Sequence, residues 1–381
     1  MGVNYPLRRQ AQLGPKGRAW RRGAGADGRH RQVILSGGAA MDLFVGLDVS
    51  VRMTSVCVMD VNGKVLKEAK VESEPQAIAS LLGSLDGQYR RVGLEAGPLS
   101  QWLYSGLAVA GYPIICVETR HMKAALSAQI NKTDRNDARG IAQMMRVGLF
   151  RPVYVKTERS QEIRMLLTAR KFLQSKIIDA ENNLRGLLRN FGMKVGAVTR
   201  PQFEARVIDL IKERPHLAMT IAPLLEVRRV LREQYQCLHK AMERLAADDG
   251  ICRLLMTAPG VGPLVSLTFR AGIDEAARFS RSRSVPAHFG LTPARYQSGE
   301  LDRGRGISKC GDSGFRWALV EAAGIIMRQR TKSSPLKVWG MALAKRRGPA
   351  KALVAVARRL ATILHRMWTD NTEYRWQAQS A

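Results

Sequence analysis

Residues 41–150 alternate between short apolar runs and segments with helical spacing. Apolar runs bounded by polar residues or glycine predict five strands, over residues 43–49, 54–60, 64–71, 91–95 and 112–117. Between the second and third strands, Val61-Asn62-Gly63 carries the Asn-Gly signal of a hairpin turn. Helical spacing predicts helices over residues 76–85, 99–110 and 134–147. The predicted order is therefore a three-stranded meander, then alternating helix and strand, then a closing helix.

Four acidic residues fall at the ends of these predicted elements. Asp48 lies near the end of the first strand, and Glu95 lies at the end of the fourth. Asp134 and Asp137 are three residues apart in the first turn of the closing helix, on one face, where negative charge is favoured. The element order is that of an α/β ribonuclease-H-like domain, in which acids from the first and fourth strands meet acids from the closing helix. The sequence therefore predicts that the four carboxylates converge.

Carboxylates gathered at one point repel one another unless a cation lies between them. Hard oxygen ligands suit Mg²⁺ or Mn²⁺, so the predicted convergence indicates a divalent-metal site formed by Asp48, Glu95, Asp134 and Asp137. Taken alone, Asp48 is also typical of a polar strand end, and Asp134 is typical of a helix N-cap. The placement of all four acids at one predicted edge favours the metal site.

From about residue 158 the apolar pattern changes to that of long helices. One apolar face, interrupted at Arg170, contains Ile163, Leu166, Leu173, Ile177, Ala180, Leu184, Leu187 and Phe191. After a break around residues 192–201, a seven-residue repeat with Tyr235 and Met242 at its intervening positions contains Leu224, Leu231, Leu238 and Leu245. This spacing predicts two long helices that form a coiled coil over residues 158–249, with a helical hairpin inside one chain as the alternative.

Residues 250–381 are predicted to form a mainly helical C-terminal domain. An apolar segment at 254–256 leads into a glycine-rich turn that contains Gly260 and Gly262, and a second helix follows. This pattern is similar to a helix-hairpin-helix element, whose backbone N–H groups hold a phosphate without reading the base sequence. A plain turn between two helices is equally compatible with the pattern.

A glycine- and arginine-rich stretch follows at residues 289–316. Glycine lets the backbone approach phosphates closely and cations neutralise them, so the candidate nucleic-acid contacts here are Arg295, Arg303, Arg305, Lys309 and Arg316. Ser298 precedes Gly299 in the same stretch. From local sequence alone Ser298 is typical of a turn residue, because a serine hydroxyl is a poor nucleophile until it is activated.

The charge of the chain points to a polyanionic partner. The formal net charge is +29, and its distribution is +7 over residues 1–40, +1 over 41–150, +7 over 151–250 and +14 over 251–381. Most contact with nucleic acid is therefore predicted outside the acidic domain. The five cysteines form no CxxC pair, and no apolar stretch approaches a membrane span. These features indicate a soluble cytoplasmic protein without structural zinc.

Residues 1–40 are rich in arginine and glycine and lack hydrophobic periodicity. They also lack the apolar core of a secretory signal. Two interpretations remain: a basic, disordered arm that binds nucleic acid, or a translated extension upstream of a true start at Met41.

The ordered set of motifs resembles a known family. GLDVS at 46–50, GLEAGP at 93–98 and KTDRNDA at 132–138 are followed by PGVGP at 259–263, FGLTPARYQSGE at 289–300 and GISKCGDSGFRWAL at 306–319. Together they look like the motifs of the DEDD-type insertion-sequence transposases, over roughly Met41 to the C-terminus. In that family a RuvC-like domain precedes a C-terminal transposase domain that bears a serine.

The resemblance implies a bacterial DNA transposase and recombinase, active in the cytoplasm at the nucleoid. It assigns the metal site to the four acids and the nucleophile to Ser298, with Ser308 as the competing serine. It also implies action on element ends and target DNA, a homo-oligomer (dimer or tetramer), and a structured noncoding RNA that guides the recombinase. The corresponding domains are 1–40 (extension), 41–157 (RuvC-like), 158–249 (coiled coil) and 250–381 (transposase domain).

Three other classes remain open at this stage. A junction resolvase would use the same four acids to activate water and would not need Ser298. A non-catalytic DNA-binding protein would leave the acids without a role. GLDVS also resembles the first phosphate loop of actin-like ATPases and sugar kinases, but the second Asp-x-Gly loop of those proteins is not found at the required place.

Overall fold

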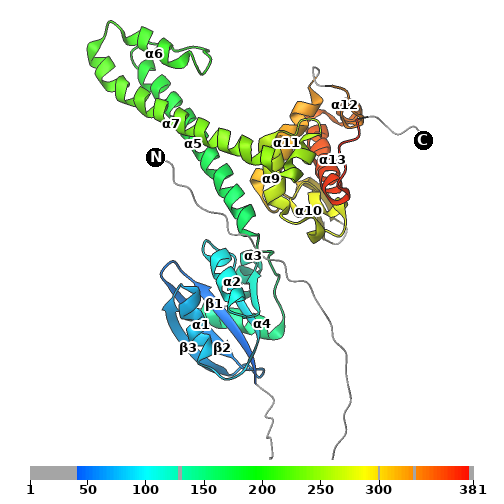
Figure 1. The fold of residues 1–381 in the computed structure, drawn as a ribbon. Helices are drawn as coiled ribbons and strands as arrows, with labels where there is room; N and C mark the ends of the chain where they lie inside the picture. Colours follow the sequence, from blue (N-terminus) through cyan, green and yellow to red (C-terminus); the bar gives the residue numbers. More distant parts are fainter. Residues whose placement is uncertain (1–40, 128–130, 299–300, 329–331, 377–381) are drawn as a thin grey trace, which may run out of the picture. The chain divides into compact units, whose positions relative to one another are not determined.

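The computed structural model describes residues 41–127, 131–298, 301–328 and 332–376, so the predictions for residues 1–40 lie outside the described residues. The chain divides after Arg151 into two compact units (Figure 1), and each is described by itself below. The first unit contains a mixed sheet with helices. The second unit is mainly helical.

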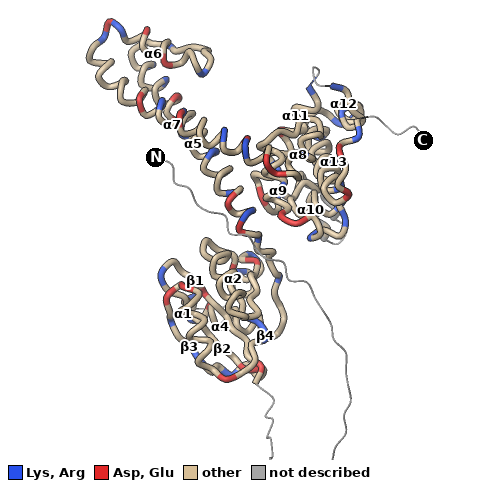
Figure 2. The backbone as a smooth tube through the Cα atoms, in the orientation of Figure 1, with Lys and Arg blue, Asp and Glu red and all other residues tan. Residues whose placement is uncertain are grey.

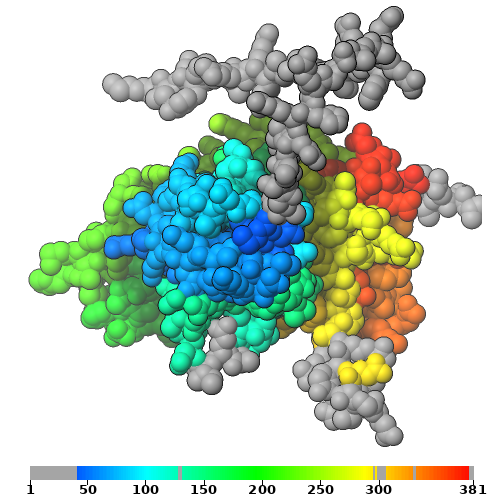
Figure 3. All heavy atoms as spheres, turned by 90° about the horizontal axis from the view of Figure 1, so that it is seen from below, coloured from blue at the N-terminus to red at the C-terminus, as the bar shows by residue number. Residues whose placement is uncertain are grey.

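The first unit is built on a five-stranded sheet in the order β3-β2-β1-β4-β5. Strand β1 is antiparallel to β2 and parallel to β4, β2 is antiparallel to β3, and β4 is parallel to β5. The strands are β1 (Asp42–Val49), β2 (Met53–Met59), β3 (Val65–Glu72), β4 (Gln88–Glu95) and β5 (Ile114–Val117). The order places β1 at the centre. Figure 3 shows one face of this unit, on which a dark-blue area lies among lighter blue and cyan residues.

Helices cover both faces of this sheet. Side chains from alternate positions of β1 and β4, such as Leu47 and Leu94, pack with α1 (Pro75–Gly83) and α2 (Ser100–Val109). On the other face, Phe44 packs with α3 (Thr119–Leu126) and α4 (Asp134–Val147). Successive residues of a strand point to opposite faces, so the two cores alternate along β1.

Gly46 allows α4 to lie directly on the centre of the sheet. A Cβ atom at this position would be 2.1 Å from the carbonyl oxygen of Ala138 and 2.3 Å from the backbone nitrogen of Ala142. Any side chain at position 46 would therefore push α4 away from β1. Two residues further along the same face of β1 is Asp48, so this contact also determines how closely the start of α4 approaches it.

The predicted elements of this unit agree with the observed ones within a few residues, and α4 has the predicted bounds. The hairpin at Val61-Asn62-Gly63 is also confirmed: Gly63 has φ +85°, and the Asp60 carboxylate accepts hydrogen bonds from the backbone of Asn62 and Lys64, both at 2.9 Å. Helix α3 was not predicted. The α/β arrangement is consistent with the ribonuclease-H-like fold that the sequence predicts.

The second unit begins with a helical hairpin. Helices α5 (Glu158–Arg189) and α7 (Pro215–Asp248) pack against each other, with α6 (Phe203–Ile211) between them in sequence. Leu184 packs near Ile221, whereas Ile163 packs near Met242, so the two long helices run antiparallel. The alternative of a hairpin within one chain is thus realised, and a coiled coil between chains stays a prediction.

The predicted apolar face of α5 is wrong at its C-terminal end. Leu188 is buried in the hairpin core, whereas Leu187 is 36% exposed and Phe191 is 50% exposed. Arg170, which interrupts the pattern, is buried on the same face and donates to the Tyr235 hydroxyl at 2.5 Å and to Nδ1 of His239 at 3.2 Å. A buried guanidinium with partners on α7 explains why an arginine can occupy an apolar position.

The C-terminal part of the second unit is mainly helical, as predicted. Its elements are α8 (Gly250–Met256), α9 (Pro263–Ile273), η1 (Ala276–Arg278), η2 (Ser282–Ser284), α10 (Val285–His288), β6 (Pro293–Ser298), β7 (Leu301–Ile307), α11 (Ser313–Met327), α12 (Pro335–Arg347) and α13 (Pro349–Asp370). Side chains from most of these helices form one core that includes Phe269, Phe315 and Leu360. The antiparallel pair β6–β7 was not predicted.

Two aspartates connect α5 to this core. Asp274, at the C-terminal end of α9, accepts hydrogen bonds from the Tyr154 hydroxyl (2.9 Å), the backbone (2.8 Å) and hydroxyl (2.6 Å) of Thr157, and the Ser160 hydroxyl (2.5 Å). Asp312 caps α11 and accepts from Arg164 of α5 at 2.5 Å. The hairpin and the C-terminal helices are therefore held together by buried polar contacts as well as by apolar packing.

Among the helices within the described ranges, none has the length and apolar character that crossing a membrane requires.

Candidate functional site

Asp48 and Glu95 are neighbours on the α4 face of the sheet. The parallel register pairs Leu47 with Leu94, so Asp48, the next residue of β1, lies beside Glu95, the next residue of β4. Alternation along the strands places both carboxylates on the face covered by α4. Both side chains are partly buried. The predicted meeting of acids from the first and fourth strands is thus realised in the backbone.

The start of α4 brings two further acids to this edge. Thr133, not Asp134, is the N-cap of α4, and its hydroxyl accepts from the backbone nitrogen of Asn136 at 3.2 Å. Asp134 lies in the first turn, largely exposed, and forms an ion pair with Lys70 of β3 at 3.1 Å. Asp137 lies one turn further on, partly buried. We call Asp48, Glu95, Asp134 and Asp137 the acidic site.

The pKa values of Asp48 and Glu95 are raised by burial and by neighbouring carboxylates. Burial, followed by the charges of Asp137 and Asp134, raises the pKa of Asp48 to about 6. Burial, followed by the charges of Asp48 and Asp137, also raises the pKa of Glu95. Lys132 lowers the pKa of both carboxyls and Lys70 lowers that of Asp48, but both pKa values stay raised. Burial and the neighbouring carboxylates thus both oppose the charged forms of Asp48 and Glu95.

The donor set fits a divalent cation chemically. Partly buried carboxylates with raised pKa values are the environment in which a hard cation relieves repulsion. In the described part of the chain, however, no three His, Cys, Asp or Glu side chains are arranged closely enough to form a ready ligand set. The acids are within electrostatic range of one another without forming a complete coordination shell.

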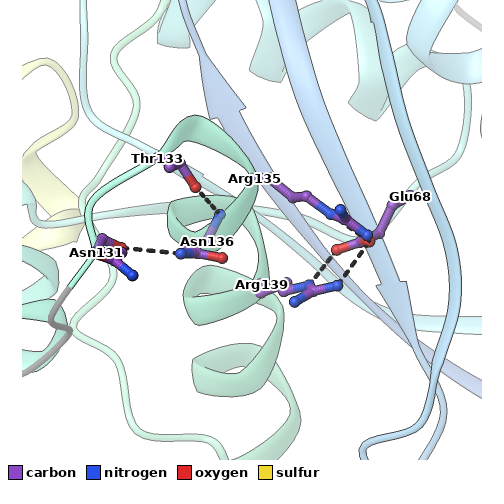
Figure 4. Close-up of polar contacts among 6 residues, drawn as sticks. All are labelled: Glu68, Asn131, Thr133, Arg135, Asn136 and Arg139. Atoms are coloured by element: carbon purple, nitrogen blue, oxygen red, sulfur yellow. Dashed lines mark hydrogen bonds and ion pairs between the residues drawn. The ribbon is translucent and has the colours of Figure 1, made fainter.

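A second cluster lies beside the acidic site and was not predicted. Glu68 of β3 contacts two arginines of α4: Arg135 Nε donates to it at 2.7 Å, and an Arg139 guanidinium nitrogen donates at 2.9 Å (Figure 4). Each arginine makes a further, shorter contact with the same carboxylate. Hydrogen bonds from Arg139 and then Arg135 lower the pKa of Glu68 to about 2. The partners of Glu68 lie about seventy residues away in the sequence, so the residues around Glu68 give no indication of them.

The candidate nucleophile Ser298 is the last residue of β6, in the second unit. Its backbone is paired with Leu301 at the start of β7, and Gly299 lies outside the described residues. Arg295 belongs to the same strand, and Arg303 and Arg305 belong to β7. The structure thus brings these candidates onto one antiparallel pair of strands.

Lys309 and Arg316 lie just after this hairpin. Lys309 adopts φ +56°, unusual for a residue with a side chain, and its backbone donates to Gly290 at 3.2 Å. The Arg316 guanidinium donates to the carbonyl oxygens of Phe289 (3.3 Å) and Gly311 (3.2 Å). Arg316 therefore has a structural role, and a phosphate would compete with these carbonyls for it.

The two glycines of the predicted phosphate-binding turn have different surroundings. Gly260 has φ +74°, and a Cβ there would be 2.5 Å from the carbonyl oxygen of Ala322 in α11. Gly262, the N-cap of α9, has open space around its Cβ direction. Gly260 is thus required for packing, whereas only Gly262 presents free space to a ligand.

Charged residues are unevenly placed along the chain (Figure 2). Along α5 and α7, basic and acidic residues are interspersed, as in the i,i+3 pairs Lys176–Asp179 and Arg229–Glu226. The last turn of α12 instead carries three consecutive exposed cations, Lys345, Arg346 and Arg347, that have no acidic partner among the described residues. The C-terminal part therefore offers the more strongly basic surface.

An α/β domain with an acidic edge, followed by a basic helical domain, is the organisation of an enzyme that acts on nucleic acid. Family models match both parts of the chain: a transposase model of the DEDD IS110 type covers residues 45–193, and the model for the IS116/IS110/IS902 transposase family covers residues 252–337. The chain belongs to this family of insertion-sequence transposases.

Individual relatives agree with the family models. The transposase for insertion sequence element IS1111A of Coxiella burnetii is 29% identical over 343 residues, which cover 87% of this chain and 91% of the relative. The transposase for insertion sequence element IS1328 of Yersinia enterocolitica is 26% identical over 246 residues, 64% of this chain and 74% of the relative. The similarity therefore extends through both units.

Proposed function

We propose that this transposase cuts and rejoins DNA with two groups of residues, the acidic site in the first unit and Ser298 in the second. The observation that carries the proposal is the placement of Asp48 and Glu95 side by side under α4, with pKa values that stay raised although Lys132 acts on both. A basic protein that concentrates negative charge at one sheet edge needs a cation there.

The four acids would hold Mg²⁺ or Mn²⁺. When bound, the cation supplies charge stabilisation at the scissile phosphate. Ser298 attacks that phosphorus through its hydroxyl oxygen, which loses its proton to a base. A phosphodiester bond to the serine forms as the bond to the leaving sugar oxygen breaks. Because the number of phosphodiester bonds is unchanged, a sugar hydroxyl of a second DNA end can reverse the step and join the strands.

The resemblance noted above extends the proposal to partners. The protein would act on element ends and target DNA with a structured noncoding RNA whose base pairing selects both. Sequencing the nucleic acid that copurifies with the protein tests this part. Recovery of random cellular RNA would contradict guidance by a dedicated RNA.

Joining two duplexes requires several active sites, so we propose a dimer or tetramer formed through α5 and α7. Apolar side chains that are exposed on these helices support this, including Met165 at 70% and Phe172 at 57% exposure. Sedimentation of the wild-type protein and of Phe172→Glu tests it. A wild-type monomer at working concentration would rule the proposal out.

Trapping the covalent intermediate tests the chemistry. Full-length protein, end-labelled element DNA and Mg²⁺ are expected to give a protein–DNA adduct that resists denaturant. Ser298→Ala should abolish it, whereas Ser308→Ala is the matched control and should retain it. If Ser298→Ala still transfers strands without an adduct, the acids activate water as in a junction resolvase.

Substitution of the acids separates catalysis from simple DNA binding. Asp48→Asn is expected to abolish strand breakage while leaving DNA binding close to the wild-type level, because the basic surface lies in other parts of the chain. Unchanged breakage in Asp48→Asn and Glu95→Gln would instead indicate a non-catalytic DNA-binding protein.

A further inference from the structure

Two rows of residues cross the sheet beneath α4. In the first row the strand register aligns Glu68 with Cys57, Cys57 with Gly46 and Gly46 with Gly93. The second row lies two residues nearer the acidic edge, since the register aligns Lys70 with Ser55 and Ser55 with Asp48. Residues in both rows face α4, because side chains two apart on a strand share a face.

Helix α4 is attached to the first row at two points. At the centre, the backbone at Ala138 and Ala142 rests directly on Gly46. At the edge, Arg135 and Arg139, one helical turn apart, both donate to Glu68 (Figure 4). Apolar side chains of α4 hold the helix on the sheet, and the contact with Glu68 fixes where the two guanidinium groups lie.

The same helix carries the acids of the second row. Successive helix residues are about 100° apart around the axis, so the stripe of Arg135 and Arg139 adjoins the stripe of Asp134 and Asp137. With the arginine stripe held on Glu68, Asp134 reaches Lys70 at 3.1 Å and Asp137 acts electrostatically on Asp48. The two stripes thus meet different partners: the arginines contact Glu68, and the aspartates face Lys70 and Asp48.

The contact with Glu68 also determines where two positive charges lie. Arg135 and Arg139 are within two residues of Asp137, and both guanidinium groups remain partly exposed. Without Glu68, the carboxylates of Asp134 and Asp137 on the adjoining stripe of α4 would be available to these two guanidinium groups. A guanidinium bound there would occupy the oxygens that a metal ion requires and would oppose its charge.

We propose that Glu68 is a positioning residue of the acidic site, which holds Arg135 and Arg139 away from its carboxylates and so keeps them available to a divalent cation. The inference rests on the proposed function, because it assumes that the acidic site binds the cation. It adds a residue outside the four acids, which acts through its two arginine partners.

Binding of Mn²⁺ alone to the full-length, DNA-free protein, measured by calorimetry, tests the inference. Glu68→Gln is expected to weaken binding by about tenfold to a hundredfold, the usual effect of removing a group that orients metal ligands. Glu72→Gln removes the same charge from the same strand at an exposed position and should bind as the wild type does. Equal affinities for Glu68→Gln and the wild type would overturn the inference.

Two arginine variants separate the charge effect from general damage to the fold. Glu68→Gln/Arg135→Gln/Arg139→Gln should regain most of the lost affinity, since no freed guanidinium remains. Arg135→Gln/Arg139→Gln, which keeps Glu68, should bind Mn²⁺ at least as tightly as the wild type. No recovery in the triple variant, or weaker binding by the double variant, would contradict the role assigned to Glu68. Thermal melting in EDTA identifies any variant that is unfolded.

Asp48→Asn distinguishes failure of the inference from failure of the proposed function. If Asp48→Asn abolishes Mn²⁺ binding and Glu68→Gln does not weaken it, the metal site stands and Glu68 has only a structural role. If Asp48→Asn binds Mn²⁺ as tightly as the wild type, the metal site itself is wrong.

Discussion

At the scale of single residues, Gly46 is the described glycine whose Cβ direction is most restricted. Gly46→Ala would place a Cβ within 2.3 Å of two backbone atoms of α4, which cannot move without moving the helix. We expect a loss of about 3 kcal/mol in the unfolding free energy of the first unit, at the upper end of overpacking costs. Chemical denaturation followed by circular dichroism measures it.

Gly83→Ala is the matched control for this substitution. Gly83 ends α1, and a Cβ there would meet only the Tyr112 hydroxyl at 3.7 Å, an ordinary contact. Alanine in a helix should leave stability unchanged or raise it slightly. If both variants lose stability equally, the close approach of α4 to β1 is not the cause.

His365 of α13 gives the C-terminal helices a dependence on pH. Its ring is 1% exposed; Nε2 donates to the Ala276 carbonyl at 3.0 Å, and Nδ1 lies 2.9 Å from the Ser282 hydroxyl. Burial lowers the pKa of His365 below its usual value of 6.5, although the Ala276 carbonyl and Asp370 oppose the shift. The unfolded chain therefore binds the proton more tightly than the folded protein does.

The sign of this effect follows from proton linkage. The stability contributed by neutral His365 is complete above pH 6.5 and is lost as pH falls below it through the folded pKa. Melting temperatures between pH 5 and 7.5 should decline toward acid, and His365→Gln should reduce that slope. The exposed His288 is the control, and His288→Gln should keep the slope.

At the scale of elements, strands and helices could be predicted from the sequence where apolar residues recur with a regular period. The buried strands β1 and β4 and the amphipathic helix α4 were predicted on this basis. Helix α3 was missed because Met122 is its only buried residue. The β6–β7 pair was missed because an arginine- and glycine-rich segment is typical of a loop.

The acidic site was predictable because its acids follow apolar strands and begin a helix. Its supporting contacts were not, because they join distant elements. Lys70 and Glu68 lie on β3, an edge strand whose local sequence gives no indication of the partners on α4. The N-cap was assigned to Asp134 in one interpretation, whereas Thr133 has the extended backbone that a cap requires.

Asp274 connects α9 with the start of α5 and offers a prediction for these two elements. Asp274→Asn replaces a carboxylate that accepts four hydrogen bonds by an amide that accepts fewer and adds donors. We expect a loss of about 2 kcal/mol in the unfolding free energy of the second unit. Asp248→Asn, an exposed aspartate at the end of α7, is the control and should change little in a denaturant titration.

At the scale of the whole molecule, the charges separate the two proposed tasks. The first unit combines the acidic site with an almost balanced charge of +1 over residues 41–150, whereas residues 251–381 carry +14. A nearly balanced net charge leaves few excess lysine and arginine side chains that could bind the carboxylates in place of the metal cation. Glu68 serves the same end locally, since it neutralises two of the arginines nearest to the acids.

This separation predicts where DNA affinity lies. The variant Lys345→Gln/Arg346→Gln/Arg347→Gln neutralises the exposed cations in the last turn of α12 and should weaken binding to random-sequence duplex DNA. It should also reduce the slope of log affinity against log salt concentration, because each phosphate contact contributes about one unit to that slope. Fluorescence anisotropy at salt concentrations from about 50 to about 200 mM, where phosphate contacts respond to salt, measures the affinity and the slope. The control Lys64→Gln/Lys67→Gln/Arg90→Gln removes three exposed cations from the first unit and should leave affinity and slope close to the wild-type values. Equal losses in the two triple variants would show that the first unit contributes as much to phosphate binding as the basic C-terminal part.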